Sequence, residues 1–197
     1  MSENHDKIKK DLQLYVDVSD EEAAYFSEKF EEVKLRKKQL IVQPGFTAKK
    51  RFYVIDGALR SFILTDSGKE TTIALATNDW WITDYNSYIY QQPATLFVEA
   101  LTNSTVLQLD FEKEQELKDN NPKYERFFRI KAERGLAAQQ RRIITNLTHS
   151  AEERYALLAE KYPQFIQHVP QYVLASYLGM TTEFLSKIRN NNTKKKS

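Results

Sequence analysis

A chain of 197 residues is long enough for a substantial hydrophobic core in one or two domains, and its 41% hydrophobic and 28% charged residues describe an ordinary globular protein. It contains no cysteine, which excludes disulfides, thiolate metal sites and cysteine-bound iron–sulfur clusters. No apolar run is long enough to cross a bilayer, and the polar first residues lack the apolar core of a signal peptide. We therefore expect a cytoplasmic protein without a membrane partner.

Charge is distributed unevenly along the chain. Residues 1–120 contain 15 Lys and Arg against 21 Asp and Glu, a net charge of −6, whereas residues 121–197 contain 14 against 6, a net charge of +8. A nucleic-acid binder needs local positive charge more than total charge, so the C-terminal part is the better candidate for such a partner. The closing Lys194, Lys195 and Lys196 would add phosphate contacts there without adding specificity.

The first predicted element is an amphipathic helix of about three turns that begins near residue 20. Ser19 and Glu22 have the spacing of a capping box, in which each side chain accepts a hydrogen bond from the backbone N–H of the other residue. Apolar residues, among them Phe26 and Phe30, follow directly.

Short runs of β-branched and aromatic residues dominate residues 39–109. The runs 52–55 and 58–64 flank Asp56 and Gly57, a combination that predicts a β-hairpin. Further runs and turn signals continue the series at near-regular spacing, which predicts an antiparallel β-roll or jelly-roll barrel. These are the runs 71–76, 96–100 and 106–109, and the turns Pro44-Gly45 and Asp66-Ser67-Gly68.

Two helices are predicted after the β-rich region. Pro122 suits the first turn of a long helix that ends near Leu147, and Ser150 with Glu153 forms a second capping box before a helix that ends at Pro163. The apolar residues of the long helix lie on three faces, which one partner cannot cover, so we expect it to pack on the β-roll and on its copy in a second subunit. The alternative is a helix buried in a monomer core. The three faces are Ala132, Leu136, Ile143 and Leu147; Ile130, Ala137 and Ile144; and Tyr124, Phe127 and Phe128.

The segment 171–190, QYVLASYLGMTTEFLSKIRN, has the pattern of a helix-turn-helix that docks in the major groove of DNA. Ala175 is small where the second helix must cross, and Gly179 follows where the chain must turn sharply. Leu185 and Ile188 would face the first helix, which leaves polar side chains pointing outward toward base edges and phosphates. The candidate DNA-binding residues are Thr181, Thr182, Glu183, Ser186, Lys187 and Arg189.

The outward side chains suit distinct roles. Glu183 would accept a hydrogen bond from cytosine N4 or orient a neighbour, Lys187 would donate to guanine or phosphate, and Arg189 would anchor a phosphate. The alternative interpretation is an ordinary helical hairpin with a solvated polar face.

An acidic β-roll, a long helix and a C-terminal helix-turn-helix in this order resemble the Crp-Fnr family of bacterial transcription regulators. The resemblance rests on FYVIDGALRSFILTDSGKE, residues 52–70, and more specifically on LGMTTEFLSKIR, residues 178–189. In the best-known members the recognition helix begins with arginine and glutamate, and another arginine follows four residues after the glutamate. Here Glu183 matches, whereas Thr182 and Lys187 replace the arginines.

The resemblance implies an α+β fold in three parts. Residues 1–120 would form the β-roll sensor domain, residues 121–148 the dimerisation helix, and residues 149–197 a winged-helix-like domain carrying the helix-turn-helix. The expected function is that of a homodimeric, sequence-specific regulator, with double-stranded DNA and RNA polymerase as its other partners.

The expected effector site departs from the family pattern. Cyclic-nucleotide binders of the family hold ribose and phosphate with a Gly-Glu pair and, shortly afterwards, an arginine followed by serine or threonine. Residues 78–100 contain neither a Gly-Glu pair nor any Lys or Arg, and Ala94 followed by Thr95 stands at the arginine position. A buried phosphate without a cation is costly, so we do not expect tight binding of cyclic AMP.

Other cofactors are not expected either. The histidines His5, His149 and His168 lie outside the predicted roll, and without cysteine neither the iron–sulfur nor the haem branch of the family is matched. Aromatic residues of the roll would line a pocket for an apolar or aromatic ligand, or simply fill the core. The candidate ligand-binding residues are Trp80, Trp81, Tyr85, Thr95 and Phe97.

Two other functions are open at this point. Jelly-rolls also support metal-dependent enzymes, but the predicted roll has acids such as Asp84 and Glu99 and no histidine for the usual imidazole-based metal site, so we expect no catalytic residue and no bound metal. Alternatively, the roll senses nothing and serves only to dimerise and to recruit RNA polymerase.

Overall fold

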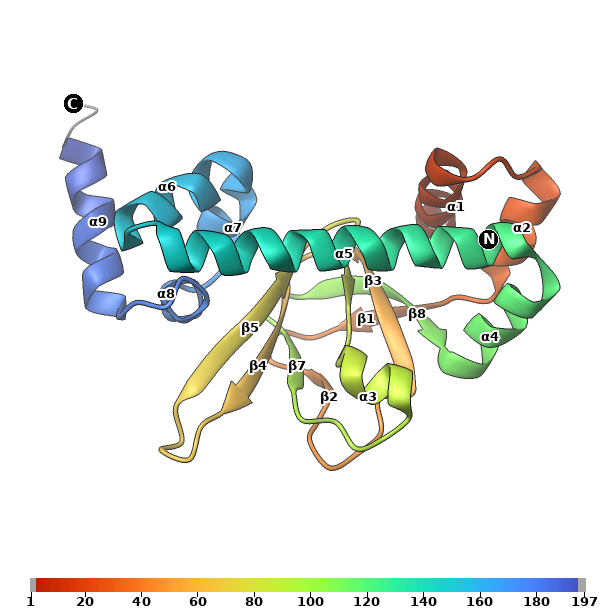
Figure 1. Cartoon of the computed structure of the whole chain (residues 1–197), viewed down its shortest axis with the longest axis horizontal. Helices are drawn as coiled ribbons and strands as arrows, with labels where there is room; N and C mark the ends of the chain where they lie inside the picture. Colours follow the sequence, from red (N-terminus) through yellow and green to blue (C-terminus); the bar gives the residue numbers. More distant parts are fainter. Residues whose placement is uncertain (1–2, 195–197) are drawn as a thin grey trace.

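The computed structural model describes residues 3–194, with side chains up to residue 191. Figure 1 shows a β-roll below one long helix, with α1, α2 and α4 at one end of that helix and α6 to α9 at the other. The helices are α1 (Glu3–Tyr15), α2 (Asp20–Glu28), α3 (Tyr85–Tyr90), α4 (Phe111–Asn120), α5 (Pro122–Thr148), α6 (Ala151–Lys161), α7 (Pro163–His168), α8 (Gln171–Tyr177) and α9 (Thr182–Lys194). The strands are β1 (Glu31–Leu35), β2 (Leu40–Val42), β3 (Lys50–Asp56), β4 (Leu59–Leu64), β5 (Glu70–Ala76), β6 (Trp81–Ile82), β7 (Phe97–Ala100) and β8 (Ser104–Asp110).

The strands form two antiparallel sheets, which confirms the predicted jelly-roll type of fold. Their orders are β1-β8-β3-β6 and β2-β7-β4-β5. Side chains of both sheets meet in one buried cluster, as expected when alternate residues of each strand point inward. Its members include Leu35, Phe52, Val54, Leu59, Val98 and Val106.

Two of the three predicted turns of this region have different outcomes. The hairpin at Asp66-Ser67-Gly68 is confirmed, because β4 pairs with β5 and Gly68 has a φ of 76°. The prediction of a hairpin at Asp56 and Gly57 is wrong. β3 pairs with β6 and β8, whereas β4 pairs with β5 and β7, so Gly57 carries the chain from one sheet to the other.

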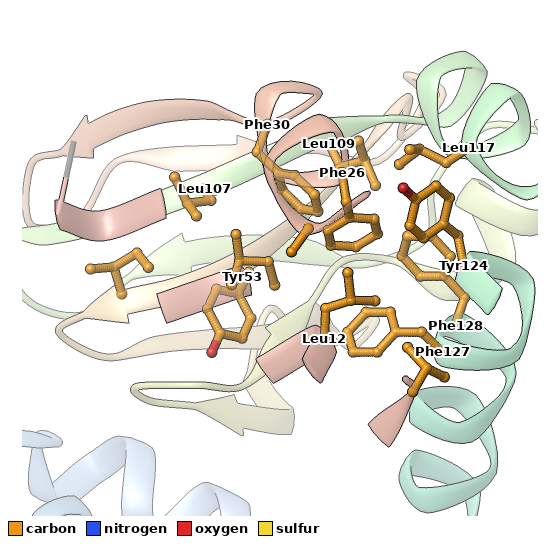
Figure 2. Packing of buried hydrophobic residues seen from close by; sticks show 14 residues of the cluster. Leu12, Phe26, Phe30, Tyr53, Leu107, Leu109, Leu117, Tyr124, Phe127 and Phe128 are labelled. Atoms are coloured by element: carbon orange, nitrogen blue, oxygen red, sulfur yellow. The ribbon is translucent and has the colours of Figure 1, made fainter. Parts of the chain in front are cut away.

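Helices α1, α2 and α4 pack with the start of α5 against the sheet that contains β3 and β8. Figure 2 shows the aromatic rings of Phe26, Phe30, Tyr124, Phe127 and Phe128 gathered in this cluster beside Tyr53. The capping box that begins α2 is confirmed, whereas α1, α3 and α4 were not predicted from the sequence.

The long helix α5 agrees closely with the predicted range. Of its three apolar faces, the one with Tyr124, Phe127 and Phe128 is buried against the roll. The face with Leu136, Ile143 and Leu147 is exposed, and so is Ile144 of the remaining face. Large apolar side chains that remain exposed in one chain are candidates for an interface.

Helices α6 to α9 enclose a third buried cluster. Tyr155, Leu158, Phe165, Leu174 and Leu185 are among its buried members. The same cluster continues into the roll, through Ala58, Leu75 and Leu101, so the C-terminal domain is packed onto the roll rather than tethered to it.

The winged-helix-like part of the prediction does not agree with the described C-terminal residues. Between Phe111 and Lys194 every regular element is a helix, and β8 is the last described strand. After α6 ends at Lys161, as predicted, Pro163 begins the short helix α7, which was not predicted from the sequence.

Candidate functional site

The helix-turn-helix is formed by α8 and α9. Gly179 has a φ of 67°, and the N–H of Met180 donates to the carbonyl of Ala175 at 3.0 Å, which closes the turn after α8. The hydroxyl of Thr181 accepts a hydrogen bond from the N–H of Phe184 at 3.2 Å, which caps the first turn of α9. The predicted role of the glycine is confirmed.

The inner face of α9 is apolar and the outer face is polar. Leu185 and Ile188 are buried in the core shared with α8, as expected from their spacing. Of the six candidate DNA-binding residues, Thr181, Glu183 and Lys187 are exposed. Thr182, Ser186 and Arg189 are half-buried. The side chains from residue 192 onward, including the three closing lysines, lie outside the described residues.

Ser186 differs from expectation in one respect. Its hydroxyl accepts a hydrogen bond from Nε2 of Gln171, the first residue of α8. Gln171 also donates to the carbonyl of Thr182 at 3.4 Å, so one amide holds the beginnings of both helices together. Ser186 directly follows the buried Leu185, which places it at the edge of the outer face.

Glu183 lies in the first turn of α9, where a negative charge is favoured. A hydrogen bond from its own backbone N–H, followed by one from the Thr181 hydroxyl, lowers the pKa of its carboxyl. The Glu183 side chain therefore stays ionised and can only accept hydrogen bonds.

Helix α8 is fixed on the free edge of β5. The hydroxyl of Ser176 accepts from the N–H of Thr72 at 2.8 Å and donates to the carbonyl of Glu70 at 3.3 Å. On the same edge, the guanidinium of Arg142 in α5 donates to the carbonyl of Ile73 and lies 4.3 Å from the ring centre of Tyr177. Backbone groups at a sheet edge need partners, and here α8 and α5 supply them. The direction of the helix-turn-helix relative to α5 is thus set by the roll.

The five candidate ligand-binding residues do not form one pocket. The ring centre of Trp80 lies 5.1 Å from that of Tyr162 in the C-terminal domain, whereas the ring centre of Trp81 lies 5.3 Å from that of Tyr53 in the cluster of Figure 2. Neighbouring residues of an extended chain point to opposite sides, which separates the two tryptophans.

The other three candidates lie elsewhere. Phe97 stacks on Phe62 with ring centres 4.9 Å apart. Tyr85 and Thr95 are exposed. A cavity of about 550 Å³ opens between β1 and β2, and none of the five candidate residues lines it.

The segment from Asp84 to Leu96 is organised around one buried carboxylate. Oδ1 of Asp84 accepts from the N–H of Ser87 at 3.1 Å, which caps α3. Oδ2 accepts from the N–H groups of Thr95 and Leu96 at 2.8 and 3.0 Å. Sequence reasoning counted Asp84 only as a possible acid for metal chemistry. The spacing of Asp84 and Ser87 was the signal for a helix cap.

Among the residues whose side chains the structure describes, no cluster of three or more His, Asp or Glu could hold a metal ion. None of the described helices combines the length and apolarity required to cross a membrane.

The sequence of the roll is similar to a known domain family. Residues 32–121 match the family model of the cyclic nucleotide-binding domain. No curated protein matches the sequence.

Solved structures resemble the roll together with the helices that follow. FixK2 from Bradyrhizobium japonicum matches with a TM-score of 0.73 and 17% identity over 84% of this chain and 85% of that chain. The c-di-GMP-responsive global regulator CLP of Xanthomonas campestris matches with a TM-score of 0.70 and 14% identity, over 90% and 93%. The Thermus thermophilus catabolite activator protein matches with a TM-score of 0.57 and 18% identity, over 92% and 87%. The chain has the fold of the Crp-Fnr regulators.

Proposed function

We propose that this chain is a homodimeric, sequence-specific DNA-binding transcription regulator of the Crp-Fnr type that does not respond to cyclic AMP. The observation that carries the proposal is the exposed polar face of α9, held by a closed turn on α8 and directed away from a buried core. Helices of this kind read the major groove with side chains near the helix start. The structural likeness to a global regulator and to a catabolite activator protein supports this function.

The DNA contacts are proposed for the face that begins at Thr181. Lys187 and Glu183 would reach base edges, and Arg189 a phosphate, while the shorter side chains of Thr181 and Thr182 would make polar contacts near the helix start. Ser186 would contribute with the hydroxyl that already accepts from Gln171.

The second subunit is proposed to pack along α5. Leu136, Ile143 and Leu147 are separated by seven and four residues, which is the spacing of a coiled-coil seam. A twofold axis along this seam would present two copies of α9, as recognition of two half-sites requires. While bound to DNA, such a regulator would also contact RNA polymerase.

Cyclic AMP is excluded from the proposed function for an electrostatic reason. The phosphate position implied by the family pattern is Ala94 followed by Thr95, and no Lys or Arg occurs in residues 78–100. Removing a phosphate from water without a cationic partner costs more than the remaining N–H donors recover.

Selection of bound sequences from random double-stranded DNA tests the proposed function directly. We expect an enriched, nearly palindromic site whose half-sites lie about 34 Å apart, one helical turn of DNA. If no sequence is enriched while the protein remains folded, sequence-specific recognition is not its function.

Replacing Lys187 by alanine should weaken binding to the selected site by about tenfold or more, because a good base contact contributes roughly 1–3 kcal/mol. The measurement is a titration of labelled DNA at several salt concentrations, with the selected and with an unrelated sequence. Lys10→Ala is the matched control, because Lys10 is an exposed helical lysine on α1, at the other end of the molecule (Figure 1). Equal affinities of both variants would contradict the assignment of Lys187.

A further inference from the structure

A buried carboxylate occupies a cradle of hydrogen-bond donors in the roll. Asp84 is 1% exposed. Its two oxygens accept from the N–H groups of Ser87, Thr95 and Leu96, and the Thr95 hydroxyl lies 3.4 Å from Oδ2. The donors come from two segments, α3 and the stretch before β7, which the carboxylate joins.

Hydrogen bonds alone compensate the burial of this carboxylate. Among the residues whose side chains the structure describes, no Lys, Arg or His forms an ion pair with Asp84. An anion that is taken out of water without a cation must be satisfied by several donors, and here there are four. Clustered backbone N–H groups are also what proteins use to bind an external oxyanion.

The surroundings of Asp84 fix the cradle further. The Ser87 hydroxyl donates to the carbonyl of Gln92 and accepts from the N–H of Ala48 at 2.8 Å. Ala94, which directly precedes the donors of Thr95 and Leu96, is buried. The stretch that carries these donors is therefore ordered by internal contacts.

We infer that Asp84 is a specificity-determining residue. Its carboxylate occupies the position at which this domain would otherwise bind the oxyanion of a ligand. A cyclic nucleotide phosphate would meet donors that are already used and a negative charge at the same place. Asp84 thereby closes the cradle to phosphate ligands and orders α3 without an effector. The inference deepens the cyclic AMP part of the proposed function and rests on no DNA contact.

The test is rescue of a cavity variant by small carboxylates. Asp84→Gly removes the carboxylate and leaves its donors unsatisfied, so we expect the Tm to fall by about 5 °C or more. Sodium formate and sodium acetate should restore part of this loss in a concentration-dependent manner, compared with sodium chloride at equal ionic strength. The wild-type Tm should respond equally to all three salts, and cyclic AMP should not raise it.

Two further variants serve as controls, one for the charge at position 84 and one for the loss of an N-cap aspartate. Asp84→Asn fills the same space without charge, so formate should not stabilise it. Asp110→Ala is the matched control, because Asp110 is also an N-cap aspartate but makes no side-chain capping bond. If Asp84→Gly folds only in the presence of formate, the inference is supported.

Two results would overturn the inference. One is a formate response of Asp84→Gly no larger than that of Asp110→Ala; the other is stabilisation of the wild-type protein by cyclic AMP. Neither measurement involves DNA, so a failure here is distinct from a failure of site selection, which would overturn DNA recognition alone.

Discussion

Replacing Leu147 by glutamate in α5 is expected to convert the protein into a monomer and to lower its affinity for a two-half-site operator by a factor of about one hundred or more. Leu136, Ile143 and Leu147 are 67%, 58% and 80% exposed in the single chain. Burying one such side chain contributes roughly 1.5–3 kcal/mol to the free energy of dimerisation. Each of these residues contributes twice, because a twofold axis places one copy from each subunit in the interface. Glutamates at position 147 would also place two negative charges beside each other in this seam.

The effect on DNA binding follows from how α8 is held. Ser176 fixes α8 to the edge of β5, and Arg142 connects that edge to α5. The separation of two α9 helices is therefore determined by the pairing of two α5 helices. A monomer keeps one recognition helix and loses the gain from binding two half-sites together.

The mass in solution, measured by light scattering after size-exclusion chromatography, decides the oligomeric state. Leu14→Glu is the matched control, because Leu14 is a 73% exposed leucine on α1, outside the seam. It should remain dimeric and bind DNA as the wild-type protein does. A dimeric Leu147→Glu variant would show that the subunits pair through another surface, for which Ile144 on the neighbouring face of α5 is the next residue to change.

Features determined by neighbouring residues could be predicted from the sequence. Both capping boxes are present, and so are the positive φ of Gly179 and the hairpin closed at Gly68. In each case the interacting groups lie within a few residues, so the local sequence contains the whole interaction.

Features that depend on distant contacts could not be predicted in the same way. Helix α1 buries only Ile8 and Leu12 along its length, and α3 is a six-residue helix that depends on the cap from Asp84. Their stability comes from the tertiary contacts that they make. The packing partners of Trp80 and Trp81 likewise depend on which part of the molecule covers each side of the chain.

The Asp56-Gly57 turn illustrates the limit of local reasoning. The dipeptide correctly marks a reversal with a positive φ, but the same conformation serves a hairpin and a crossing between sheets. Which one forms depends on β8 occupying the place beside β3 and on β7 and β5 flanking β4. Strand pairing of this kind is set by residues about fifty positions away, such as Val106 opposite Val54.

Gly57→Ala is expected to lower the free energy of unfolding by roughly 2–4 kcal/mol, and the Tm by about 10 °C. Gly57 has a φ of 103°, a conformation that disfavours any Cβ. A Cβ at this position would also overlap Oγ of Ser104 and lie 2.7 Å from its Cβ, closer than real Cβ contacts allow. The overlap arises because the crossing brings residue 57 against Ser104, the first residue of β8.

Gly68→Ala separates these two costs. Gly68 has a φ of 76°, but a Cβ there would meet nothing within 4 Å, so this variant carries the backbone strain without the overlap. Urea unfolding followed by circular dichroism should therefore give a loss of about 1 kcal/mol for Gly68→Ala and clearly more for Gly57→Ala. Equal losses would mean that Ser104 can move away, and that the close approach of the two segments does not constrain the crossing. The larger loss at Gly57 would identify a contact, rather than backbone strain alone, as the reason that this crossing requires glycine.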